Sequence, residues 1–174
     1  MAARVGILAA ILAIALGAPR VNADTAVGVG PAVRSDELGR GTGLEATAGV
    51  QLARAGELSG WWHVTGAVAH SAEADSTTRE LRVGPRFWSC SGGACIGAAA
   101  DVGLDEISAA TGGSERALID GRLLVSVALD GEARVALVAS AGARGSLALS
   151  WDGARPAQRA ERGTVVGVML VLRP

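Results

Sequence analysis

The feature that most constrains the fold is a two-residue alternation that runs from Arg134 to Trp151 (RVALVASAGARGSLALSW). Its odd positions carry no polar side chain, whereas its even positions carry two arginines, three serines and small residues. Side chains of a β-strand point alternately to the two faces of a sheet, whereas a helix repeats every 3.6 residues. The stretch therefore predicts a long strand with one apolar face and one polar, small-residue face.

Seven further segments are predicted to be strands, and turn-like clusters rich in glycine separate them. They cover residues 26–34, 43–53, 60–70, 79–88, 94–106, 117–130 and 163–174. The last segment is apolar on both faces, so its orientation is not predicted. Eight strands can close into a small barrel. The sequence thus predicts an all-β fold, a single eight-stranded antiparallel up-and-down β-barrel.

The N-terminal residues follow the order of a secretory signal peptide. Arg4 precedes an apolar run over residues 5–18, and residues 21–23 (VNA) form a small-residue cleavage site. The run is shorter than the ~20 residues that a membrane-spanning helix needs. We expect residues 1–23 to be a signal peptide and residues 24–174 to form the barrel domain.

The two cysteines, Cys90 and Cys95, lie in the short sequence SCSGGAC. In an exported protein, an even number of cysteines at close spacing indicates a disulfide bond. A metal or redox site is the alternative, but two cysteines without a nearby histidine make a poor ligand set. We predict a Cys90–Cys95 disulfide that fixes a turn.

The charge balance excludes one class of partner. The formal net charge is −1, with no polybasic segment, so the sequence gives no indication of nucleic-acid binding. All 16 basic residues are arginine. Arginine stays charged and forms forked hydrogen bonds with carboxylates, which suits ion pairs away from water.

The alternation alone fits two barrels of opposite polarity. A periplasmic or secreted, lipocalin-like barrel that binds a small apolar ligand has its apolar face inside, and a transmembrane barrel has its apolar face outside. Glycine, alanine and serine are frequent on the polar face, as a narrow lumen requires. That face also carries charged residues of nearly balanced sign, predicted to form a lumen network: Glu45, Glu80, Arg82, Arg86, Asp101, Asp105, Asp120, Arg122, Arg134 and Arg144. Buried charges must be paired, so this composition favours the transmembrane form. Ordinary solvated surface pairs are the alternative.

The connections point the same way, because the second, fourth and sixth are on average shorter than the others. Outer-membrane barrels have short periplasmic turns and longer outer loops. In strand pattern and connections the chain resembles the small eight-stranded outer-membrane β-barrel family, similar to the OmpA transmembrane domain and its OmpX-like relatives. The resemblance implies a place in the Gram-negative outer membrane and a structural, adhesive or narrow-pore (porin-like) role.

Aromatic residues are few, and tyrosine is absent. Those near predicted strand ends are expected to form the interfacial girdle of such a barrel: Trp61, Trp62, Phe87, Trp88 and Trp151. The chain departs from the family in its alanine-rich apolar face and in lacking a terminal aromatic residue.

No catalytic motif is present. His63 and His70 fall on opposite faces of one predicted strand, so they cannot form a metal pair, and neither lies in a recognisable hydrolase motif. Asp101 and Asp105 are about 13 Å apart along a strand, too far for a coupled acid–base pair. We expect no enzyme activity, no metal and no cofactor; a lipid-modifying enzyme that uses either histidine is the weaker alternative. Outer-membrane lipid is the expected partner, together with an extracellular or cell-envelope partner bound through residues 36–41, 72–77, 108–115 and 152–163.

Overall fold

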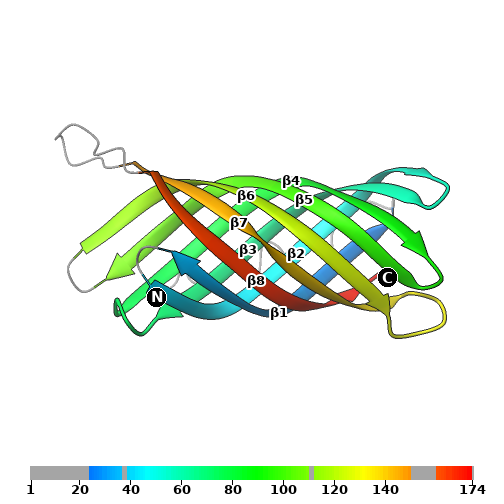
Figure 1. Cartoon of the computed structure of the whole chain (residues 1–174), viewed down its shortest axis with the longest axis horizontal. Coiled ribbons are helices and arrows are strands. Elements are labelled where there is room, and N and C mark those ends of the chain that lie inside the picture. Colours follow the sequence, from blue (N-terminus) through cyan, green and yellow to red (C-terminus); the bar gives the residue numbers. More distant parts are fainter. Residues whose placement is uncertain (1–23, 37–38, 110–111, 150–159, 174) are drawn as a thin grey trace.

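The computed structural model describes residues 24–36, 39–109, 112–149 and 160–173. Antiparallel strands close into one up-and-down barrel, in which each strand pairs with its sequence neighbours and the last pairs with the first (Figure 1). The strands are β1 (Thr25–Asp36), β2 (Gly39–Ala55), β3 (Leu58–Ser71), β4 (Ser76–Ser91), β5 (Ala94–Ala109), β6 (Gly112–Ala128), β7 (Val135–Leu149) and β8 (Ala160–Leu172). The predicted fold class is confirmed. Within the described residues, no helix is long and apolar enough to cross a membrane. The predicted signal peptide lies outside these residues.

The polar face of the strands points into the barrel. On β7, Ser140 and Arg144 are buried, whereas Leu137 is exposed on the outer surface. The same parity holds on the other strands, so the large apolar side chains form the outer surface: Val29, Val33, Leu44, Leu52, Leu58, Trp62, Val68, Leu81, Phe87, Ile96, Val102, Leu104, Ile119, Leu123, Val125, Val127, Leu129, Leu137, Val166, Val168, Leu170 and Leu172. This orientation is the reverse of the one that the lipocalin-like alternative requires.

The orientation of β8, which the sequence left open, follows from its pairing with β1 and β7. Val165 and Met169 are buried inside the barrel, and Val166 and Val168 face outward. The lumen face of this strand is therefore mainly apolar.

The two ends of the barrel differ. One end holds the connections at residues 56–57, 92–93 and 129–134, together with the start of β1 and the end of β8 (Figure 1). We call it the disulfide end, because the Cys90–Cys95 bond lies there, across residues 92–93. The opposite end, which includes the β3–β4 connection at residues 72–75, is the loop end.

The strands extend further than the alternation predicted. Residues 39–41 begin β2, and residues 108–109 and 112–115 belong to β5 and β6, although the sequence suggested loops at both places. The loop end therefore carries less irregular chain than expected, and several polar residues assigned to loops lie on strands.

Candidate functional site

An apolar cluster fills the lumen at the disulfide end. Its buried members include Trp61, Trp88, Leu124 and Met169. The Arg173 guanidinium lies 5.8 Å from the Trp61 ring centroid, within cation–π range. The members of the cluster carry no charge, so this layer separates the charged lumen from the disulfide end.

The predicted aromatic girdle is only partly on the outer surface. Trp62 and Phe87 face outward, whereas Trp61 and Trp88 are buried in the lumen. The reason is parity, because Trp61 shares its face with His63, and Trp88 shares its face with Arg86. The fifth predicted member, Trp151, lies outside the described residues.

Two buried carboxylates at mid-barrel are shared among three arginines. Asp120 Oδ2 accepts hydrogen bonds from Arg82 Nη1 at 2.5 Å and from Arg122 Nη2 at 3.0 Å. Arg144 donates to Asp120 Oδ1 from Nε at 2.7 Å and to Oδ2 from Nη2 at 2.9 Å. Glu45 accepts from Arg82 Nη2 at 2.5 Å and from Arg122 Nη1 at 3.0 Å. Both carboxylates are thus compensated by arginines of other strands and, for Asp120, also by Arg122 of its own strand β6.

Glu80 extends this network towards the loop end. Its Oε1 contacts Arg34 Nη1 at 2.5 Å and also accepts from Arg144 Nη1. Its Oε2 accepts from Arg144 Nη2 at 3.1 Å and lies 3.3 Å from Arg82 Nε. The Glu80 carboxylate therefore forms ion pairs with three guanidinium groups. We call Arg34, Glu45, Glu80, Arg82, Asp120, Arg122 and Arg144 the central network.

A second cluster lies nearer the loop end. Arg116 donates to Asp105 from Nε at 3.0 Å and from Nη2 at 2.6 Å. Its Nη1 donates to Glu161 Oε2 at 2.7 Å. Arg116 and Asp105 are buried, so this forked pair is a charge-assisted contact of the strong kind.

The lumen between the central network and the apolar cluster is polar but less completely paired. Arg86 Nη2 donates to Thr65 Oγ1 at 3.1 Å, and Thr47 Oγ1 lies 3.3 Å from His63 Nδ1. Asp101 is buried, and Arg82 Nη1 lies 3.9 Å from its Oδ2. Neither Asp101 oxygen accepts a hydrogen bond from the described part of the chain. Buried polar atoms of this kind normally hold ordered water.

The structure buries nine of the ten residues assigned to the lumen network and leaves Arg134 out. The Arg134 side chain is 70% exposed and pairs with Glu132 at 2.6 Å in the β6–β7 connection. Its position follows from the strand boundary, because β7 begins at Val135. The alternation in the sequence therefore begins one residue before the strand itself, and Arg134 belongs to the connection.

Three charged residues of the lumen were missing from the sequence-based set: Arg34, Arg116 and Glu161. Parity alone could have identified two of them. Arg34 continues the inward face of Gly28 and Gly30, and Arg116 lies four residues before Asp120 on the same face of β6. The composition of residues 152–163 predicts a loop, so parity does not identify Glu161.

The chemistry available in the lumen is limited. His63 is buried and His70 is exposed, so the two histidines lie on opposite faces of β3, as the alternation predicted. In the residues that the structure describes, no group of three histidine, cysteine or acidic side chains could hold a metal ion. The Cys90–Cys95 disulfide is present and joins directly paired residues of β4 and β5.

Comparison with known proteins gives a fold but no sequence family. No family model and no curated protein matches the chain. The crystal structure of Neisserial surface protein A (NspA) superposes with a TM-score of 0.57 at 16% identity, covering 88% of this chain and 98% of that chain. A major outer membrane protein from Thermus thermophilus has a TM-score of 0.55 at 10% identity, covering 88% of this chain and 100% of that chain. The chain therefore has the fold of the small eight-stranded outer-membrane β-barrels.

Proposed function

We propose that this protein is a non-enzymatic β-barrel of the Gram-negative outer membrane, with a structural or surface-interaction role. One observation carries the proposal: the outer wall of the barrel is apolar while its lumen holds the central network. A bilayer is the medium in which that polarity is stable, since lipid contacts the apolar wall and closure leaves no unpaired strand edge.

The interaction role is assigned to the loop end. Within the described residues, side chains of the apolar cluster occupy the lumen at the disulfide end and ion pairs occupy its middle, so we assign no solute passage to it. We therefore assign the binding of a partner outside the cell to the β3–β4 connection and the strand ends around it. In this proposal, residues 1–23 direct export and are removed.

The absence of enzyme activity is also part of the proposal. His63 contacts a threonine hydroxyl, and within the described chain no carboxylate hydrogen bonds to its other ring nitrogen, so it lacks the orienting acid of a hydrolytic triad. A phospholipid and lipopolysaccharide turnover assay, run beside a His63→Phe variant, is expected to show no activity above the variant.

Membrane placement is tested by expression in a Gram-negative host. The protein is expected in the detergent-extracted outer-membrane fraction, and its gel mobility should differ between unheated and boiled samples. Recovery in the periplasmic fraction without detergent would overturn the proposal. A matched variant with Leu123→Glu and Val125→Glu on the outer wall should fail to insert, because charged groups there face hydrocarbon.

A further inference from the structure

A cavity at the loop end of the lumen is not explained by the central network below it. Four strands line it through Arg34, Gly39, Gly41, Ala69, Ser71, Ser76 and Thr78. It opens on one side, and the centre of a water-sized sphere can occupy about 20 Å³ of it. Gly39 and Gly41, which carry no side chain, form its β2 wall, and Ala69 and Ser71 form its β3 wall.

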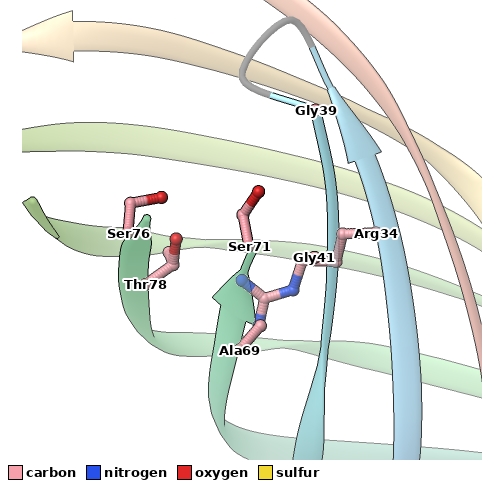
Figure 2. Close-up of a pocket in the computed structure, with 7 residues that line it drawn as sticks. All are labelled: Arg34, Gly39, Gly41, Ala69, Ser71, Ser76 and Thr78. Carbon is pink, nitrogen blue, oxygen red and sulfur yellow. The ribbon is translucent and has the colours of Figure 1, made fainter. Parts of the chain in front are cut away.

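The floor of the cavity is cationic. Figure 2 shows the Arg34 side chain extending from β1 past β2 towards β3, with its guanidinium group between Gly41 and Ala69 in this view. Its Nη1 pairs with Glu80, a carboxylate that Arg82 and Arg144 share. The Arg34 charge is thus only partly compensated, and its remaining N–H groups can donate towards the cavity.

Hydroxyl groups complete the wall. The Ser71 hydroxyl oxygen accepts a hydrogen bond from the Ala74 N–H at 3.4 Å, which leaves the O–H free to donate. Ser76, which is buried, and Thr78 also line the cavity. The guanidinium and three hydroxyl groups together offer at least four hydrogen-bond donors to a ligand in the cavity.

We propose that this cavity binds a phosphate group, either as the free ion or as a monoester on a sugar, with Arg34 as the cationic donor and Ser71, Ser76 and Thr78 as hydroxyl donors. A tetrahedral oxyanion presents enough acceptor oxygens for these four donors, which come from β1, β3 and β4. One negative group opposes it at the rim, where the Glu73 carboxylate accepts from the Arg40 N–H at 3.3 Å. The site does not depend on the membrane assignment, since it needs only a folded barrel.

Gly41 allows the cavity to be filled without disturbing the ion pairs. A Cβ added there would have its nearest neighbour, the His70 carbonyl oxygen, at 3.6 Å, which is ordinary contact. Gly41→Val should therefore fold and occupy the space above Arg34. Thr42→Val, one residue further along β2 and facing outward, is the matched control.

The experiment is a titration of the full barrel, folded in a detergent without phosphate, monitored by amide NMR shifts. Inorganic phosphate and glucosamine 1-phosphate are the two probes. At least one is expected to bind saturably and to shift Gly39, Gly41 and Ser71, with affinity at least about tenfold weaker in Arg34→Gln and Gly41→Val and unchanged in Thr42→Val. Stronger binding of the sugar phosphate identifies a conjugated ligand, and equal or stronger binding of inorganic phosphate identifies the free ion.

The proposal is overturned if neither probe saturates, or if affinity is unchanged in both Arg34→Gln and Gly41→Val. It is also overturned if Arg79→Gln, which removes an exposed arginine of the outer surface, weakens binding as much as Arg34→Gln does. The mobility shift on heating is scored on the same samples, so loss of this site is distinguishable from failure of the outer-membrane assignment.

Discussion

Asp120 is the carboxylate whose loss should cost the barrel most. It accepts from Arg82, Arg122 and Arg144, and its exposure is 1%. Asp120→Asn keeps the shape but removes the charge, and it turns an N–H donor towards guanidinium groups that can only donate. Removing one member of a buried ion pair costs about 3–5 kcal/mol, so we expect the free energy of unfolding to fall by that amount.

The assay is equilibrium urea unfolding of the protein in lipid vesicles, monitored by the fluorescence of the lumen tryptophans. The control is Glu106→Gln, because Glu106 pairs with Arg79 at 3.2 Å in an exposed position. That change should cost no more than ~1 kcal/mol. Asp120→Asn leaves the four arginines of the central network against two carboxylates. Adding Arg144→Met should recover part of the loss, since it lowers this excess of buried positive charge. Equal losses in Asp120→Asn and Glu106→Gln would refute the reasoning and would mean that water screens the central network as well as it screens the surface.

Three further outcomes follow from the lumen and its disulfide end. In single-tryptophan variants, Trp62 should be quenched by bromine-labelled lipid and Trp61 should not, and equal quenching would contradict the assigned parity. Replacing Cys90 and Cys95 by serine should lower the free energy of unfolding by at most ~2 kcal/mol, because the closed loop is short, and a larger loss would show that the bond does more than fix a turn. The reconstituted barrel should pass no ion current in a planar bilayer, while Trp88→Ala should raise the current by thinning the apolar cluster; an open wild-type channel would contradict the packing of that layer.

The sequence predicts most of this fold, because each strand places two different environments on its two faces. Parity separates Ser140 and Arg144 from Leu137, and the composition of the polar face, together with the connection lengths, favours the lumen for the first two. It could not assign β8, where both faces are apolar and only pairing with β1 and β7 decides. The positions of the strand ends were predicted least well. Polar residues near a barrel rim are compatible both with an alternating strand and with a polar loop, so the sequence does not distinguish the two.

The errors in the site have the same origin. Arg134 fits the alternation but lies just before the first residue of β7. Glu161 lies on β8, although the composition of the residues before it predicts a loop. Trp61 and Trp88 were predicted to belong to the outer aromatic girdle because they lie near strand ends. Their parity, which they share with buried polar residues, places them in the lumen. Which arginine meets which carboxylate could not be predicted at all, because these contacts cross the lumen and depend on the register of the whole barrel.

The central network also has a consequence for how the chain is assembled. Arg122 meets Glu45 across 77 positions of sequence, and Arg144 meets Glu80 across 64. No single hairpin contains both partners of either contact. A chain with only some strands inserted therefore has charged groups in the forming lumen that lack part of their ion pairs while they lose contact with water. Partly built intermediates are therefore penalised, whatever the stability of their individual hairpins. Insertion and closure should proceed as one cooperative event, in which the later strands complete the ion pairs of the earlier ones.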